Sequence, residues 1–265
     1  MAVAAAAKPG AVRRPWRYWT RQWLWAAVDL VFPPRCAGCG RSGQRWCAAC
    51  RLQVIPLTPP FCHRCGYPVP QAGLCALCQA GSHAPQSLAG ICSAAFFEGP
   101  LQKAVHQFKY QRDAILADSL ARLMLAAGPD PAPAGSLVVP VPLAPDRLAA
   151  RGYNQSELLA RTYAEWRGLR LAPRGALRVR PTAPQVGLSA RERRQNVAGA
   201  FAGEQQLVAG RPVILIDDVC TTGATLDSCA EALRAAGATQ VWGVTLARAR
   251  LPEARIGSLL KLAGT

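Results

Sequence analysis

The chain has 265 residues, of which 51% are hydrophobic, and its formal net charge is +16 at pH 7. This length exceeds the needs of one small module, so we expect a full α/β core together with a second, smaller domain. The charge is larger than a small-molecule enzyme needs. It favours anionic partners such as nucleic acid, an anionic membrane surface or phosphorylated ligands.

The N-terminal segment, residues 1–34, is predicted to be a disordered alanine-rich lead followed by a helix. In the helix, tryptophans recur at three-to-four spacing among arginines, which is typical of a basic amphipathic helix. Such a helix either touches a membrane surface or a partner, or packs its tryptophans on its own domain. The apolar run at residues 23–32 contains Asp29 and is too short to cross a bilayer, so we expect no transmembrane segment.

Eleven cysteines in a chain with no visible secretory signal indicate metal binding in the cytoplasm rather than disulfides. Eight of them form four Cys-x-x-Cys pairs within residues 35–81, which predicts two structural zinc sites with four thiolate ligands each. Sequential pairing is the simpler connectivity and a cross-brace is the alternative, while disulfides or an iron–sulfur cluster are alternatives to zinc. The predicted ligands are Cys36, Cys39, Cys47 and Cys50 for one ion, and Cys62, Cys65, Cys75 and Cys78 for the other.

Residues 88–250 carry the pattern of an α/β domain. We expect strands at 91–97 and 137–142 and helices at 101–110 and 114–127. Lys109 lies at the end of the first helix, where we predict that it binds substrate. The alternative for Lys109 is an ordinary position on an amphipathic surface.

Two arginines follow the second of these strands. Arg147 and Arg151 are four residues apart, so on a helix they project toward the same point, and two guanidinium groups suit a pyrophosphate. Solvated surface arginines are the alternative. Asn154 is placed to cap the helix that comes next.

A basic segment follows at residues 178–196, with five arginines and one glutamate. Proline and glycine predict a mobile loop in its first half, and Ser189 is placed to cap a short basic helix. The segment is interpreted as a flap that brings Arg191 and Arg194 to a charged substrate as catalytic residues. The alternatives are a track for a nucleic-acid backbone and plain solvation.

Residues 213–225, with the sequence Val-Ile-Leu-Ile-Asp-Asp-Val-Cys-Thr-Thr-Gly-Ala-Thr, predict a buried strand, a loop and the start of a helix. We expect Asp217 and Asp218 to end the strand and to accept hydrogen bonds from sugar hydroxyls. The loop and the helix start offer backbone N–H groups, hydroxyl groups and the positive end of a helix dipole to a phosphate. The predicted phosphate-binding residues are Thr221, Thr222, Gly223, Ala224 and Thr225.

This stretch resembles the phosphoribosyl-pyrophosphate signature of the type I phosphoribosyltransferases. Together with the Cys-x-x-Cys pairs, the Pro-Val-Pro and Arg-Gly-Tyr-Asn-Gln sequences and the basic segment, in this order, it is similar to the ComF family of competence proteins. The resemblance implies a double zinc ribbon at 35–81, a type I phosphoribosyltransferase-like parallel sheet flanked by helices at 88–250, and a tail at 251–265. It also implies phosphoribosyl pyrophosphate with Mg²⁺ as the ligand, and Asp217 and Asp218 as ribose-binding catalytic residues.

Two functions are compatible with these features. The first is a phosphoribosyltransferase, for whose acceptor the sequence offers no motif. The second is a protein without catalytic activity that handles single-stranded DNA in natural transformation, with DNA-uptake or helicase partners. The intact acidic pair favours the first function, whereas the charge, the zinc sites and the tryptophans favour the second.

Overall fold

The structure, a computed structural model, describes residues 33–81, 85–110, 113–126, 133–183 and 189–250. Of the N-terminal segment, residues 1–34, only residues 33 and 34 are described, so the predicted helix lies outside the described residues. The predicted tail, residues 251–265, also lies outside them. The same holds for residues 184–188 of the predicted flap. No helix in the described ranges is long and apolar enough to span a bilayer.

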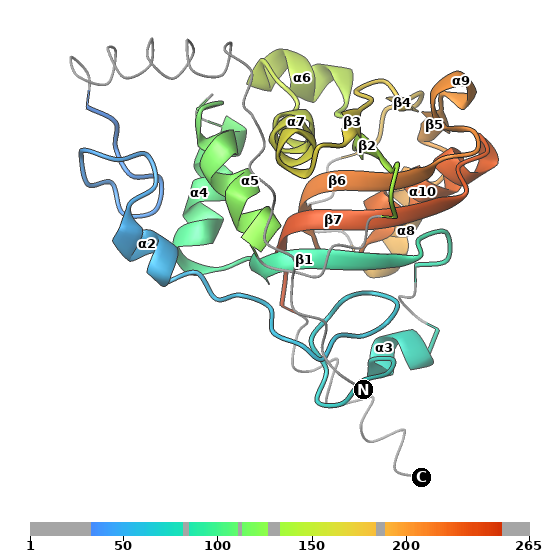
Figure 1. Ribbon diagram of the computed structural model, residues 1–265, viewed down its shortest axis with the longest axis horizontal. Coiled ribbons are helices and arrows are strands. Elements are labelled where there is room, and N and C mark those ends of the chain that lie inside the picture. The colour runs from blue at the N-terminus through green and yellow to red at the C-terminus, as the bar shows by residue number, and fades with distance from the viewer. Residues whose placement is uncertain (1–32, 82–84, 111–112, 127–132, 184–188, 251–265) are drawn as a thin grey trace.

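Five parallel strands form the central sheet in the order β1, β7, β6, β2, β3 (Figure 1). They are β1 (Gly90–Phe96), β2 (Leu137–Pro140), β3 (Arg170–Leu171), β6 (Pro212–Cys220) and β7 (Gln240–Arg248). Every neighbouring pair runs parallel. The predicted parallel α/β sheet is therefore confirmed, with the strand that begins the 213–225 motif at its centre.

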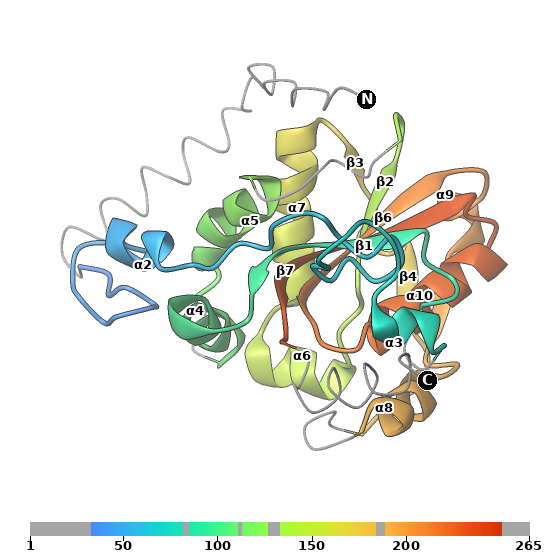
Figure 2. The same cartoon turned by 90° about the horizontal axis from the view of Figure 1, so that it is seen from below.

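The apolar run in β6 explains why helices cover both faces of the sheet. Ile214 and Ile216 belong to one core cluster and Val213 and Leu215 to the other, and all four are fully buried. Successive side chains of a strand point to opposite faces, so this run requires a layer on each side. Figure 2 shows α5 and α7 on one side and α10 on the other. The main helices are α4 (Gly99–Tyr110), α5 (Leu116–Ala126), α7 (Gln155–Arg167) and α10 (Ala224–Ala235).

Smaller elements pack around α10. The strands β4 (Ala176–Arg178) and β5 (Phe201–Gly203) form an antiparallel pair. A side-chain carbon added to Gly203 would lie 2.6 Å from Cβ of Ala236, so glycine is needed where β5 crosses the end of α10. The short helices α8 (Ala190–Val197) and α9 (Gln205–Val208) belong to the same region, whereas α6 (Pro145–Arg151) follows β2.

The strand β6 is longer than the sequence predicts. We expected Asp217 and Asp218 to end it, but it continues to Cys220. The reason is its neighbour: β7 pairs with β6 as far as Cys220, which lies opposite Arg248. Both aspartates therefore sit within a paired strand, whose backbone fixes their positions.

The cysteine-rich segment contains α2 (Ala48–Leu52) and α3 (Ala76–Gln79), and it packs on the α/β domain in two places. Its first part joins the core beside α4, where Trp46 is only 5% exposed. The stretch that follows lies along β1: Leu57 N–H donates to the Ala94 carbonyl at 3.1 Å, and Phe96 N–H donates to the Ile55 carbonyl at 2.9 Å. These bonds cover the otherwise open edge of the sheet.

Candidate functional site

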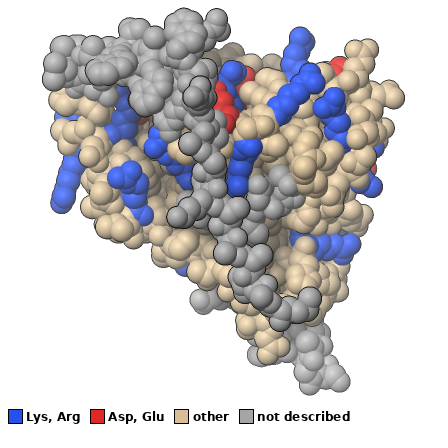
Figure 3. All heavy atoms as spheres, in the orientation of Figure 1, with Lys and Arg blue, Asp and Glu red and all other residues tan. Residues whose placement is uncertain are grey.

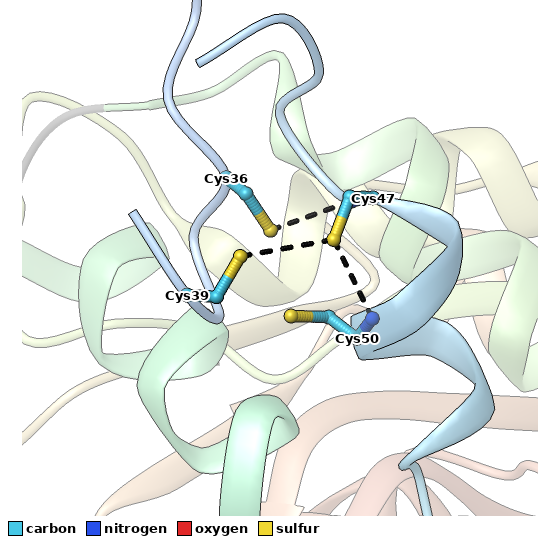
Figure 4. Close-up of side chains that lie close together, drawn as sticks. All are labelled: Cys36, Cys39, Cys47 and Cys50. Carbon is cyan, nitrogen blue, oxygen red and sulfur yellow. Dashed lines mark hydrogen bonds between the residues drawn. The ribbon is translucent and has the colours of Figure 1, made fainter. Parts of the chain in front are cut away.

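The eight paired cysteines gather into two clusters of four. In each cluster the four sulfur atoms lie within 4.8 Å of one another, and the clusters follow the sequential pairing. Figure 4 shows the first cluster, with Cys36 and Cys39 on one loop and Cys50 on α2. The sequential connectivity is therefore confirmed over the cross-brace.

The donor geometry of both clusters fits a tetrahedral zinc ion. A Zn–S distance of about 2.3 Å places two ligand sulfurs about 3.8 Å apart. Cys39 and Cys47 Sγ are 3.8 Å apart, and Cys65 and Cys75 Sγ are 3.6 Å apart. These separations are far from the roughly 2.05 Å of a disulfide, and all eleven cysteines are free.

Backbone N–H groups support the thiolate form at these sites. Cys47 N–H donates to Cys36 Sγ at 3.4 Å, and Cys75 N–H donates to Cys62 Sγ at 3.3 Å. Burial raises the pKa of the Cys36 thiol, but the backbone donors outweigh burial and lower that pKa to about 6. A lowered pKa favours metal binding, because the thiolate is the form that binds metal.

A pocket of about 570 Å³ opens where β2 and β6 end and α10 begins. Its size is within the range usual for small-molecule sites. It brings together residues from three segments of the chain that the sequence analysis singled out. Of the predicted binding residues, those lining it are Lys109, Arg147, Arg151, Asp217, Asp218, Thr221, Gly223, Ala224 and Thr225.

The two aspartates have different partners. The Asp218 side chain is buried, and its Oδ1 lies 2.9 Å from Lys109 Nζ in an ion pair. Oδ1 of Asp217 accepts a hydrogen bond from Ser156 Oγ at 2.8 Å and another from the Asp218 N–H at 2.9 Å. The pair is therefore held rigidly, with Asp218 neutralised by a cation and Asp217 hydrogen-bonded.

The protonation of Asp217 is unusual. Burial raises the pKa of Asp217 to about 7, and the negative charge of Asp218 acts in the same direction. The Ser156 hydroxyl and the charge of Lys109 oppose this shift without cancelling it. A carboxyl group with a pKa near neutrality in a pocket is typical of functional sites.

The threonine loop has the shape of an anion cradle. Gly223 is the N-cap of α10, with φ of 82°, a left-handed conformation that glycine adopts without strain. Thr222 Oγ1 accepts a hydrogen bond from the Ala224 N–H at 3.3 Å, which holds the turn. Thr222 itself is not among the residues that line the pocket. The loop thus places the positive end of the α10 dipole against the cavity.

The basic residues around the pocket match the sequence analysis only in part. Arg147 and Arg151 on α6 line it as expected. On α8, Arg193 lines the pocket and donates through Nη1 to Thr221 Oγ1 at 2.9 Å. The two arginines selected from the sequence, Arg191 and Arg194, are exposed on α8 and do not line it.

Three further pocket residues were missed from the sequence. Ser156 was overlooked because the sequence analysis explained this motif by Asn154 as a helix cap. The structure confirms the cap, since the Ser156 N–H donates to Asn154 Oδ1 at 3.1 Å. Gln155 is 1% exposed, and its Nε2 has no hydrogen-bond partner among the described residues. Tyr110 is 59% exposed, with the Arg151 guanidinium 5.1 Å from its ring centre.

Comparison with known families agrees with this architecture. Residues 27–79 match the family described as Double zinc ribbon domain, and residues 165–256 match the family described as Phosphoribosyl transferase domain. The DNA utilization protein YhgH of Salmonella typhi is 35% identical over 204 residues, which are 74% of this chain and 88% of that protein.

A second relative gives the family its name. Competence protein F of Haemophilus influenzae is 35% identical over 216 residues, covering 77% of this chain and 90% of that protein. The chain belongs to the ComF family. Competence protein ComFC of Bacillus subtilis is 26% identical to this ComF-family chain over 229 residues, 84% of the chain and 89% of the relative.

The ComF-family protein therefore combines a double zinc ribbon with a phosphoribosyltransferase-like domain, as the sequence resemblance implied. Its two clusters of four cysteines support two structural zinc ions. A solved structure of the allosteric regulatory enzyme of purine biosynthesis is 24% identical over 52% of this chain and 26% of its own, with a TM-score of 0.33. Because that score is low, the fold assignment depends on the sheet and the family matches.

Proposed function

We propose that this ComF-family protein binds phosphoribosyl pyrophosphate with Mg²⁺ and transfers the phosphoribosyl group to an acceptor. The observation that carries the proposal is the pairing of an acidic dyad with an anion cradle in one pocket. Asp217 and Asp218 lie directly before the threonine loop at the start of α10. A sugar phosphate carries both hydroxyl groups and a phosphate, which are the two kinds of group that this pocket is suited to bind.

Each part of the ligand has a complementary part of the pocket. The 5-phosphate would bind the backbone and hydroxyl groups of Thr221 to Thr225. The ribose hydroxyls would donate to the carboxylates of Asp217 and Asp218. The pyrophosphate would be held by Arg147, Arg151 and Arg193, with the unpartnered Gln155 Nε2 as a further donor.

The chemistry would follow from these charges. The bond between C1 of the ribose and the pyrophosphate oxygen breaks, its electrons leave with the pyrophosphate, and a lone pair of the acceptor forms the new bond to C1. The arginines stabilise the charge that develops on the leaving group, and the carboxylates stabilise the electron-poor sugar. Lys109 Nζ now lies 2.9 Å from Asp218 Oδ1. If Lys109 moved from Asp218 to the pyrophosphate, it would supply a further positive charge.

The pocket suits a Mg²⁺ ion that arrives with its substrate. The two cysteine clusters are the only groups of three or more metal-ligating side chains found in the described ranges, so the pocket has no three-ligand site of its own there. Mg²⁺ prefers oxygen ligands and is commonly held by phosphates together with one or two carboxylates. Asp217 and Asp218 offer such carboxylates. Bound in this way, Mg²⁺ would neutralise charge on the pyrophosphate.

Arg191 and Arg194 remain predicted as catalytic residues of a closing flap. They are carried by α8, the same short helix that places Arg193 on Thr221. A movement of α8 toward the ligand would bring further guanidinium groups to the pyrophosphate.

Calorimetry with phosphoribosyl pyrophosphate tests the proposal. The wild-type chain should bind it only with Mg²⁺ present, and Asp218→Asn should weaken binding by at least about tenfold, because the ribose contact and its charge are lost. Arg161→Gln is the matched control, since Arg161 pairs with Glu157 on the exposed side of α7, outside the pocket. Equal binding by the Asp218→Asn variant, or no binding by the wild-type chain, would contradict the proposal.

A second candidate function is the handling of single-stranded DNA. Two observations favour it: relatives are named for DNA utilization and competence, and the formal net charge is +16. In Figure 3, Lys and Arg side chains are spread over the visible face with few Asp and Glu side chains among them. DNA-uptake or helicase proteins would then be its partners.

Salt dependence tests the DNA function. The logarithm of affinity for a single strand should fall with the logarithm of salt concentration, with a slope of about 0.7 for each phosphate neutralised. A flat titration would contradict DNA binding.

We further propose that the protein acts in the cytoplasm, where reduced thiols are available as zinc ligands, and that residues 1–34 provide any contact with a membrane surface.

A further inference from the structure

Arg248 is a buried cation whose role neither the fold nor the pocket explains. It is the last residue of β7 and is 3% exposed. Among the described residues, no carboxylate forms an ion pair with it. A buried charge is unfavourable unless other charges or hydrogen bonds compensate it, so the surroundings of Arg248 must supply that compensation.

On one side, Arg248 contacts the base of the phosphate loop. Its Nη1 donates to Cys220 Sγ at 2.6 Å. The backbone N–H of Gly223 interacts with the same sulfur from the loop itself. Cys220 is 2% exposed and directly precedes Thr221. The sulfur therefore connects the guanidinium group to the loop that would hold the 5-phosphate.

On the other side, Arg248 faces the second four-cysteine cluster. Its guanidinium carbon lies 5.9 Å from the ring centre of Tyr67, two residues after the ligand Cys65. Tyr67 itself packs against the buried cysteines of this cluster, Cys62, Cys65 and Cys78. The cluster is also fixed against the sheet, because a side-chain carbon at Gly66 would lie 1.8 Å from the Ile91 carbonyl oxygen.

The metal decides whether this cluster can hold Arg248 in place. A bound Zn²⁺ holds its four ligand sulfurs in one fixed geometry, and with them the neighbouring Gly66 and Tyr67, whereas an empty cluster lacks this restraint. Only the metal-loaded cluster therefore keeps the Tyr67 ring in place beside Arg248. The first four-cysteine cluster packs beside α4 and has no such contact with the loop among the described residues.

We propose that Arg248 is a positioning residue through which the metal-loaded second four-cysteine site holds the phosphate loop in its binding conformation. The choice of ligand rests on the proposed phosphoribosyl pyrophosphate function, but the coupling between metal site and loop does not. Such coupling is reciprocal: if zinc at the second site strengthens ligand binding, then ligand raises the affinity of that site for zinc by the same factor.

Hydrogen exchange of the full-length protein tests the coupling without any ligand. In Arg248→Met the amides of residues 220–226 should exchange about tenfold faster than in wild type, within the range usual for coupled sites, while both zinc ions are retained. Arg250→Met is the matched control, because Arg250 is exposed and pairs with Glu98 just beyond the same strand. Unchanged exchange in Arg248→Met would overturn the proposal.

The metal side is tested by emptying one site at a time. Exchange is measured at low temperature on the folded fraction of each variant. There, Cys75→Ser with Cys78→Ser should speed exchange of residues 220–226, whereas Cys47→Ser with Cys50→Ser should leave it unchanged. If Arg248→Met does not fold, Arg248→Lys keeps the charge but loses the forked contact, and it should show a smaller increase. Equal effects of the two double variants on the loop would overturn the proposal.

Ligand binding separates this inference from the proposed function. If the wild-type chain does not bind phosphoribosyl pyrophosphate, the proposed function fails and the exchange data alone decide the coupling. If the wild-type chain binds it and Arg248→Met binds equally well, with unchanged exchange, the coupling fails and the function stands. In an equilibrium competition with a chelator, ligand should also raise the affinity of one site for zinc in wild type, and this effect should be absent in Arg248→Met.

Discussion

The first four-cysteine site and the acidic pocket differ in how far they compensate closely spaced groups of like charge. Both bring groups of like charge close together: four thiols within 4.8 Å in one, and two neighbouring aspartates in the other. In the cysteine site the metal and the backbone N–H groups compensate the charges, and Trp46 packs the site into the core. In the pocket, compensation is incomplete, since the pKa of Asp217 is raised to about 7.

The difference separates stability from binding. A site whose charges are compensated adds to the free energy of unfolding, whereas a site prepared for a ligand stores charges that destabilise the protein until the ligand arrives. Substitutions in the two regions should therefore have opposite consequences.

Removing the metal of the first site should have the largest effect. Cys47→Ser with Cys50→Ser should lower the free energy of unfolding by at least about 5 kcal/mol, because structural zinc contributes folding energy directly. Phosphoribosyl pyrophosphate should still bind to the fraction that remains folded at low temperature. Thermal unfolding, metal analysis and calorimetry on one sample measure the stability, the zinc content and the ligand binding, respectively. Loss of binding with stability intact would reverse the comparison.

The packing of the first site can be tested apart from its metal. Trp46→Ala should lower the free energy of unfolding by about 3–5 kcal/mol, the usual effect of removing a buried indole. Zinc content should stay at two ions per chain. Leu52→Ala is the control, since Leu52 is 87% exposed at the end of α2 and should change stability by less than about 0.5 kcal/mol.

Asp217→Asn should stabilise the protein while abolishing its function. The pKa of this carboxyl is about 7 in the folded state against an ordinary value of 3.8, so the folded state holds an extra proton between these pH values. This contribution to stability is present at low pH and is lost as pH rises toward 7. The variant keeps both hydrogen bonds to Oδ1. At pH 8 it should be more stable than wild type by on the order of a few kcal/mol, with little difference near pH 4.

Denaturant titrations across this pH range measure the effect. The free energy of unfolding of the wild type should fall between pH 4 and 7 relative to that of Asp217→Asn. If it does not, the pKa of Asp217 is not raised in the folded state. Asp218→Asn is an informative companion, because it breaks the ion pair with Lys109 and should not gain stability in this way.

The smallest effect is expected on α8. Arg193→Met should weaken binding of phosphoribosyl pyrophosphate by about tenfold, near 1.4 kcal/mol, through loss of one charge-assisted contact. Arg194→Met is the matched substitution on an exposed neighbour that does not line the pocket, and calorimetry should show a smaller loss. A larger loss for Arg194 would favour the predicted closing flap over the observed arrangement.

How far the sequence predicts this molecule depends on the range of the interactions. The motif at residues 213–225, the cysteine pairing and the caps at Asn154 and Ser189 are local, and all were predicted. The length of β6 was wrong because it depends on β7, which the sequence analysis did not place. Arg193 was missed because the choice among neighbouring arginines depends on how α8 is turned toward Thr221.

Contacts between distant segments were the least predictable. The ion pair of Lys109 with Asp218 joins two residues far apart in sequence, and composition gives no sign of it. The same holds for Gly66 against Ile91, where only the packed backbone shows why a side chain is excluded. Local motifs thus underlie the proposed ligand class, while tertiary packing set the partners of each side chain.

The stretch at residues 55–57 that pairs with β1 has a practical consequence. A fragment that begins at residue 85, made to isolate the phosphoribosyltransferase-like domain, would lack the segment that pairs with β1. Backbone N–H and C=O groups along that edge of the sheet would then be unpaired. That fragment should self-associate rather than behave as a free-standing unit. In evolution, for the same reason, the zinc-binding module and the phosphoribosyltransferase-like domain of this chain should be inherited together.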